Sequence, residues 1–325
     1  MSTKSYNFKN LVFEGGGVKG IAYIGALKVL EEKGILKNIE RIAGTSAGAI
    51  TAALLSVGFT SEEIKKSLGK VNFLDFKDDS FFLINILRLL KKYGWYKGNV
   101  FEKWLKKTIS KKVSPDITFS QLNSLKGKKN IRSLYVIGTD VNYKAHVVLS
   151  NETVPDMPIA EAVRISMSIP LFFKSVKYRN SIYVDGGVYY NYPLNLFDQE
   201  KYLVEKPEKN NNEPYNKETL GLRVDSPEEI TSQIKNEPNP NLQINSLKNY
   251  IQALIGGLVD MANKTHLREK DWDRTVYIDS LGVSSTQFDL SDKQKKELIL
   301  SGETSARKYF SWFDKSKGAE KPLNK

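Results

Sequence analysis

Residues 14–20 read EGGGVKG, and these glycines join the short apolar segment 10–13 to a longer segment with helical apolar spacing that ends near Gly34. A glycine-rich turn that leads into a helix exposes backbone N–H groups that have no partner within the helix, and the helix dipole adds positive potential there. Glycine also permits positive φ values and the close approach of an anion. The stretch therefore predicts an anion-binding turn between a buried strand and a helix.

The same residues match the dinucleotide-binding pattern G-x-G-x-x-G over Gly15–Gly20. That interpretation requires an acidic residue at the end of the next strand, about twenty residues on. Glu40 lies at this distance, but it precedes the apolar segment 41–44 instead of following it. A P-loop is also disfavoured, because no Ser or Thr follows Lys19. A nucleotide-binding module without catalysis stays an alternative.

Residues 44–48 read GTSAG, which is the G-x-S-x-G pattern of a nucleophile elbow. In such an elbow the serine occupies a sharp turn between strand and helix, and Gly44 and Gly48 would let these two elements pack closely. An apolar segment precedes Ser46 and an alanine-rich segment follows it. Two strand-turn-helix units within 58 residues predict a layered α/β fold.

A third motif, Asp185-Gly186-Gly187, follows the apolar segment 181–184. An aspartate at the carboxyl end of a strand, with glycines that leave room around it, is well placed to accept a proton. On its own the motif is typical of a turn. After the other two motifs in this order, it predicts a general base.

The chain has no cysteine and two histidines, His146 and His266. This excludes disulfides, thiolate nucleophiles and cysteine-ligated zinc, and we expect neither a metal nor a cofactor. A His-dependent α/β-hydrolase that uses Ser46 and His266 is an alternative. However, a nucleophile at position 46 leaves too little chain for the strands that normally precede it. A direct dyad of Ser46 and Asp185 needs neither histidine.

These three motifs, in this order, resemble those of the patatin-like phospholipases. EGGGVKG is similar to the oxyanion loop of that family, and GTSAG is similar to its nucleophile elbow. DGGVYYNYP at 185–193 is similar to its aspartate motif, and SMSIPLFF at 166–173 to the segment that precedes the aspartate. The resemblance extends from about residue 8 to about residue 313.

The resemblance implies a three-layer α/β sandwich with a central, mostly parallel sheet. We expect a single domain over 8–313, with a helical, lid-like insertion at about 60–130. Residues 201–245 are rich in Asn, Glu, Lys and Pro, and this composition predicts a polar surface excursion, that is, a segment that leaves the domain core. Residues 314–325 are predicted to be a polar tail.

The resemblance also implies a lipid acyl hydrolase of the phospholipase A or lysophospholipase type. Ser46 would be its nucleophile and Asp185 its general base, with a burial-raised pKa. Lys19 stands where the family often has arginine, and it lacks the planar fork that suits phosphate. The expected oxyanion-hole donors are the backbone N–H groups of Gly15, Gly16, Gly17 and Val18. The expected supporting residues are Lys19, Gly20, Gly44, Gly48, Gly186 and Gly187.

The net charge of +12 favours an anionic partner, although an organism that uses lysine widely would give the same charge. We expect the substrate to be an acyl lipid, either a phospholipid or another type, and the membrane partner to be an anionic surface. We expect no stable nucleic-acid complex, and a protein or small-molecule activator stays open.

The N-terminus has no signal-peptide core, and the apolar run 81–90 is too short and polar to span a bilayer. These features predict a cytoplasmic or peripheral membrane protein, and are also compatible with secretion without a signal peptide. The aromatic-rich region 73–110 is expected to be a lid or membrane contact, or to pack onto the sheet.

Overall fold

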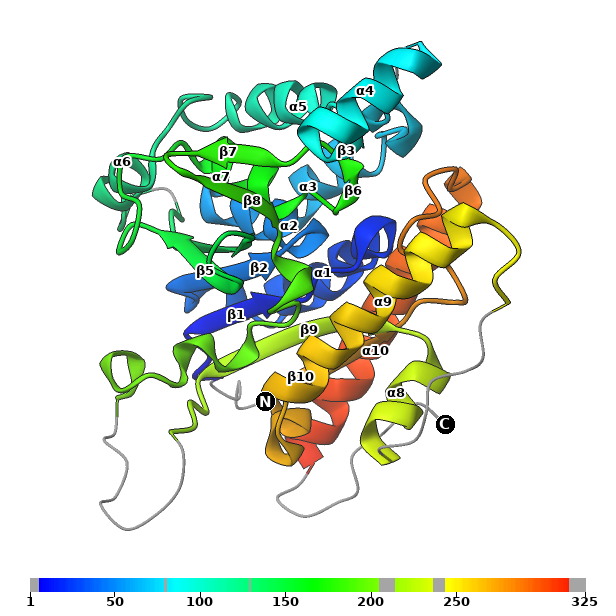
Figure 1. Ribbon diagram of the computed structural model, residues 1–325. Helices are drawn as coiled ribbons and strands as arrows, with labels where there is room; N and C mark the ends of the chain where they lie inside the picture. Colours follow the sequence, from blue (N-terminus) through cyan, green and yellow to red (C-terminus); the bar gives the residue numbers. More distant parts are fainter. Residues whose placement is uncertain (1–5, 79–80, 129, 205–213, 236–242, 316–325) are drawn as a thin grey trace.

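The computed structural model describes residues 6–78, 81–128, 130–204, 214–235 and 243–315. A central sheet of eight strands carries the fold, in the order β10-β9-β1-β2-β4-β8-β7, with β5 also paired to β4 (Figure 1). Its strands are β1 (Asn10–Phe13), β2 (Arg41–Thr45), β4 (Ser133–Asp140), β5 (Ala145–Ser150), β7 (Val176–Tyr178), β8 (Ser181–Asp185), β9 (Thr219–Asp225) and β10 (Thr275–Asp279). The five strands from β10 to β4 run parallel, and β5, β7 and β8 are antiparallel to their neighbours.

Helices flank this sheet (Figure 1). They are α1 (Tyr23–Glu32), α2 (Ala47–Ser56), α3 (Ser61–Leu68), α4 (Phe82–Lys92), α5 (Asn99–Ile109), α6 (Phe119–Ser124), α7 (Ile159–Ser166), α8 (Pro227–Lys235), α9 (Leu247–His266) and α10 (Asp292–Lys315). Short 3-10 segments include η1 (Gly17–Ala22), η3 (Phe73–Phe76), η4 (Gly186–Val188), η5 (Leu194–Asp198) and η6 (Glu200–Tyr202). Helix α1 packs against α10, and α2 packs along β2 and β4.

The sheet buries both of its faces. Successive side chains of a strand point to opposite faces, so neighbouring residues enter different cores. In β1, Leu11 and Phe13 belong to the larger core with α1 and α2. Val12 belongs to a second core, which η5 and its flanking tyrosines Tyr192 and Tyr202 complete. The predicted fold class, a sandwich around a mostly parallel sheet, is confirmed.

One sequence-based prediction is wrong. Residues 219–225 do not belong to a polar surface excursion, because they form β9, a fully buried strand between β1 and β10. Its sequence, TLGLRVD, carries Arg223 and Asp225, and these two charges pair with each other inside the protein. The Asn, Glu, Lys and Pro residues that led to the prediction lie on either side of this strand, which itself contains none of them.

The other predictions for the regions outside the motifs have mixed outcomes. The region 60–130 is largely helical, as expected, but it also holds β3 (Gly94–Tyr96), which pairs with β6 (Leu171–Phe173). The predicted tail begins inside α10, which extends to Lys315. Residues 205–213 and 236–242 of the predicted excursion, and 316–325 of the predicted tail, lie outside the described residues.

Candidate active site

Ser46 occupies the sharp turn between β2 and α2. Its backbone has φ 53° and ψ −124°, which is an unfavourable conformation for a residue with a side chain. The flanking glycines allow this turn because their backbones are in close contact. A Cβ added to Gly44 would lie 2.5 Å from the backbone of Gly48, and one added to Gly48 would lie 2.5 Å from the carbonyl oxygen of Glu14. The local geometry is that of a nucleophile elbow.

The glycine loop follows β1, the strand next to β2, and lies directly against Ser46. A Cβ added to Gly15 would be 3.2 Å from the Cβ of Ser46. The N–H of Gly15 donates to the carbonyl oxygen of Asn191 (3.1 Å), and the N–H of Val18 donates to that of Ser285 (3.0 Å). Within the described residues, the N–H groups of Gly16 and Gly17 make no such bond to another part of the chain. Two of the four predicted oxyanion donors are therefore already used by the fold.

Asp185 ends β8, and its carboxylate is buried. Oδ1 accepts a hydrogen bond from the N–H of Gly187 (2.8 Å), whereas Oδ2 has no partner at strict hydrogen-bond geometry in the described structure. Burial raises the pKa of Asp185 to about 7, against the opposing effects of the Gly187 N–H and the Ser46 hydroxyl. The predicted rise of this pKa by burial is confirmed.

The Ser46 hydroxyl is directed toward the sulfur of Met167 at 3.7 Å. As a hydrogen-bond donor it also lowers the pKa of Asp185, although Asp185 Oδ2 has no full hydrogen bond within the described residues. Ser46 therefore faces the Asp185 carboxylate at a geometry just outside that of a hydrogen bond. The segment 166–173 thus reaches the elbow, since the Ser166 hydroxyl also accepts the N–H of Ser46 (2.8 Å).

A buried polar cluster that was not predicted from the sequence fixes the start of the glycine loop. Glu14 Oε1 accepts hydrogen bonds from Asn191 Nδ2 (3.2 Å) and from Asn263 Nδ2 of α9 (3.0 Å). Asn191 Nδ2 lies equally close to the carbonyl oxygen of Gly15. Asn191 thereby links the chain after Asp185 to the glycine loop. Asn191 lies within the DGGVYYNYP motif, so the motif was the feature of the sequence from which this contact could have been predicted.

Arg223 in β9 extends the cluster to the far end of the loop. Its Nε contacts Asp225 Oδ2 and lies 3.3 Å from Glu14 Oε1, and Lys19 Nζ lies 3.6 Å from Asp225 Oδ1. All four side chains are buried. Burial raises the pKa of Glu14, while Arg223 and Lys19 outweigh burial and lower the pKa of Asp225. Lys19 therefore serves an internal ion pair in this structure.

The two histidines lie together, beside the chain that follows Asp185. The His266 ring packs against Tyr190 and His146, with ring centroids 4.5 and 5.9 Å apart, and its Nε2 is 3.1 Å from the carbonyl oxygen of Tyr189. Burial, and then His266, lower the pKa of His146. In the described part of the chain, no hydrogen bond joins either histidine to Ser46.

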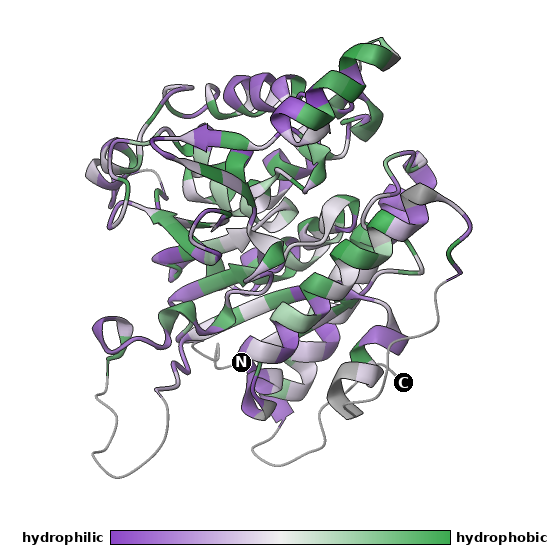
Figure 2. Cartoon of the chain, viewed as in Figure 1, coloured by the Kyte–Doolittle hydropathy of each residue, from purple (hydrophilic) through white to green (hydrophobic). Residues whose placement is uncertain are grey.

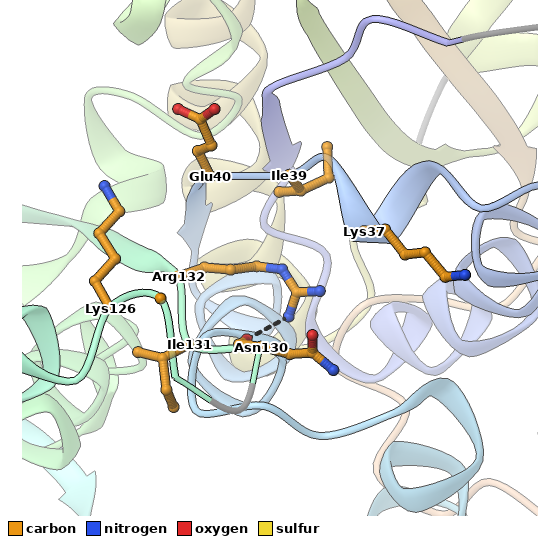
Figure 3. Close-up of a pocket in the computed structure, with 8 residues that line it drawn as sticks. Lys37, Ile39, Glu40, Lys126, Asn130, Ile131 and Arg132 are labelled. Atoms are coloured by element: carbon orange, nitrogen blue, oxygen red, sulfur yellow. Dashed lines mark hydrogen bonds between the residues drawn. The ribbon is translucent and has the colours of Figure 1, made fainter.

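A surface pocket of about 380 Å³ lies at the opposite edge of the sheet (Figure 3). Glu40 and Arg132, which line it, directly precede β2 and β4, whereas Ser46 follows β2. Arg132 is turned inward, since it donates to the carbonyl oxygens of Leu55, Asn130 and Leu36. Glu40, the acid considered for a nucleotide ribose, is therefore far from the glycine loop.

The described residues contain neither a metal-binding cluster nor a membrane-spanning helix. No group of three or more His, Cys, Asp or Glu side chains is arranged to hold a metal ion there. No helix within those ranges has the length and apolar character needed to cross a membrane.

Comparison with known proteins identifies relatives along most of the chain. The sequence model described as patatin-like phospholipase matches residues 11–198. The uncharacterized protein YqhO of Bacillus subtilis is 32% identical over 306 residues, which cover 90% of this chain and 94% of that protein. The probable lipid hydrolase 463L of Invertebrate iridescent virus 6 is 32% identical over 201 residues, or 60% of this chain and 65% of that protein.

Among solved structures, VipD from Legionella pneumophila has the same fold. It superposes with a TM-score of 0.59 at 18% sequence identity, covering 95% of this chain and 67% of that protein. At this identity the likeness concerns the fold.

Proposed function

The chain belongs to the patatin-like phospholipase family, and we propose that it is a lipid acyl hydrolase whose nucleophile is Ser46 and whose general base is Asp185. One observation carries the proposal: a serine in a strained elbow lies beside both a glycine loop and a buried, partly unpartnered aspartate. The name of the viral relative, a probable lipid hydrolase, supports the same class of substrate.

In the proposed reaction, the Ser46 side chain rotates from Met167 toward Asp185 Oδ2. Oδ2 accepts the hydroxyl proton while Oγ attacks the ester carbonyl of an acyl lipid. We infer that the N–H groups of Gly16 and Gly17 stabilise the oxyanion, since those of Gly15 and Val18 already bind Asn191 and Ser285. Removal of one such donor usually costs about 3–4 kcal/mol of transition-state stabilisation.

The remaining steps return the proton and complete the hydrolysis. The tetrahedral intermediate collapses, the bond to the leaving oxygen breaks, and that oxygen takes the proton from Asp185. Water then attacks the acyl-enzyme while Asp185 accepts its proton, and Ser46 regains a proton as the fatty acid leaves. A base with a pKa near 7 suits both proton transfers, because an appreciable fraction is ionised near neutral pH and the protonated form can still return its proton.

The proposal is tested by fatty-acid release from a panel of phospholipids and lysophospholipids of different head groups. Asp185→Asn is expected to reduce turnover by about two to four orders of magnitude, the usual contribution of a general base. His266→Ala is expected to retain activity within about tenfold, because this ring contacts Tyr190 and not Ser46. Loss of several orders of magnitude in His266→Ala would favour the His-dependent alternative instead.

The pH profile gives a separate prediction. Asp185 must be ionised to act as a base, so kcat/KM should rise with pH and level off above the folded pKa of about 7. Stability should change in the opposite direction. The folded pKa is raised above the ordinary value of 3.8, so the unfolded chain releases its proton first and stability is lost between about pH 4 and pH 7. The melting temperature of Asp185→Asn relative to that of wild type should therefore increase as pH rises through this window. An equal difference in melting temperature at pH 4 and at pH 8 would contradict this prediction.

A further inference from the structure

Helix α4 carries several large apolar side chains on its outside. Asn85 and Arg88 are its buried side chains of polar type, and Arg88 Nη1 donates to Asn85 Oδ1 (2.9 Å) and to the carbonyl oxygen of Trp95. Large apolar side chains line the other side, where Leu83 is 73% exposed, Leu87 54% and Leu90 69%. A surface helix of a soluble protein normally has the reverse arrangement. Figure 2 shows α4 at the outside of the molecule, with hydrophobic colouring along part of its length.

A second exposed apolar stripe lies on α9. Tyr250, Leu254, Leu258 and Met261 are all more than 40% exposed, and their spacing places them on one face of the helix. Helix α9 packs on η4, the turn that follows Asp185. Figure 1 shows α9 running diagonally in front of α10, with its amino-terminal end on the same side of the view as α4. The stripe on α9 thus lies on a helix that contacts the turn after the candidate base.

The charge around α4 restricts what can cover it. Residues 81–99 contain the basic side chains of Arg88, Lys91, Lys92 and Lys97 and no acidic one. Lys91 and Lys92 are exposed at the end of the apolar face, and the whole chain has a net charge of +12. A second copy of this chain would bring like charges together, which is unfavourable. An apolar face bordered by lysines instead fits an anionic lipid surface.

We propose that α4 docks on an anionic bilayer, with its exposed leucines in the acyl boundary and Lys91 and Lys92 against the head groups. The stripe on α9 makes the second contact, so the active site faces the lipid between them. This inference rests on the proposed function, because it names the surface from which the site takes its substrate.

The test measures binding to sedimenting vesicles, with Ser46→Ala chains so that no lipid is hydrolysed. The vesicles hold phosphatidylcholine alone or equal parts phosphatidylcholine and phosphatidylglycerol. Leu90→Glu is expected to weaken binding to the anionic vesicles by about tenfold or more, since it places a charge where an apolar side chain was buried. The matched control is Leu300→Glu on a different helix, α10, where a leucine is 62% exposed, and its binding should equal that of the parent chain.

The charge component has its own variant. Lys91→Gln with Lys92→Gln should weaken binding to the anionic vesicles several-fold and have little effect on the neutral ones, and added salt should reduce this difference. Because every chain here lacks the Ser46 hydroxyl, the outcome is independent of hydrolysis. Hydrolysis of a soluble short-chain ester by the wild type reports separately on the proposed function.

Two results would overturn the proposal. One is equal binding by Leu90→Glu and Leu300→Glu. If Leu90→Glu lowers the melting temperature, Leu83→Glu at the other end of the face replaces it in this comparison. The other is a parent chain that binds neither vesicle but forms a dimer that Leu90→Glu dissociates in analytical ultracentrifugation, because α4 would then contact a second copy.

Discussion

Replacement of Ser46 by alanine is expected to lower kcat/KM for lipid ester hydrolysis by about three to six orders of magnitude. The reason is chemical, since the variant lacks the hydroxyl that serves as the nucleophile in the proposed mechanism. The glycine loop would remain in place, because its contacts to Asn191 and Ser285 do not involve the Ser46 side chain. The residual rate should therefore exceed the rate in water, through the remaining oxyanion donors.

The measurement has a matched control at the other end of the same helix. Ser56 ends α2, about 15 Å from Ser46 at 1.5 Å per residue, and its buried Oγ has no hydrogen-bond partner in the described structure. Ser56→Ala should keep wild-type activity, and it should be labelled by a fluorophosphonate to the same extent as wild type. Ser46→Ala should not be labelled. Equal turnover by the two variants would remove Ser46 from the mechanism.

The sequence predicted the part of the fold that local patterns specify. The strands around the first two motifs alternate with glycine turns and helices, so β1, β2 and α2 could be placed closely. The helical apolar spacing begins at Val18, but the α-helix after the glycine loop begins later. Residues Gly17–Ala22 form the 3-10 segment η1, and the α-helix starts at Tyr23, because the glycines are poor helix formers.

The strand β9 shows why the rest could not be predicted. Its place beside β1 depends on pairing across about 200 residues, and its charges pair with Glu14 and Lys19, which are distant in sequence, as well as with each other. The short strands β3 and β6 likewise depend on each other. Composition describes a residue's own preference for water, and it contains no information about a distant ion-pair partner.

The candidate site was predictable to the extent that motifs mark it. Ser46, the glycine loop and the Asp185 turn follow three strands and meet at one edge of the sheet. Their chemical roles stay predictions for the experiments above. Arg223 and Asn263, which support the loop, carry no local motif, and only the folded chain brings them to Glu14.

Arg223→Met is expected to lower the free energy of unfolding by about 3–5 kcal/mol, the usual cost of removing one partner of a buried ion pair. The arginine is fully buried between Glu14 and Asp225, so the variant leaves two carboxylates without their main counter-ion. Lys19 would still pair with Asp225, whereas Glu14 would keep only its amide donors. Since Glu14 immediately precedes Gly15, hydrolysis should fall as well.

Urea denaturation measures this cost against a surface control. Arg307 on α10 pairs with Glu32 and Glu303 near solvent, and Arg307→Met should cost less than about 1 kcal/mol. Adding Glu14→Gln to Arg223→Met should recover part of the lost stability, because it removes one of the unpaired charges.

The stability lost in Arg223→Met should also be smaller at pH 6 than at pH 9. Burial already raises the pKa of Glu14, and without Arg223 this pKa rises further, so Glu14 stays neutral at pH 6. If Arg223→Met proves as stable as Arg307→Met, the ion-pair cluster does not hold the loop in place.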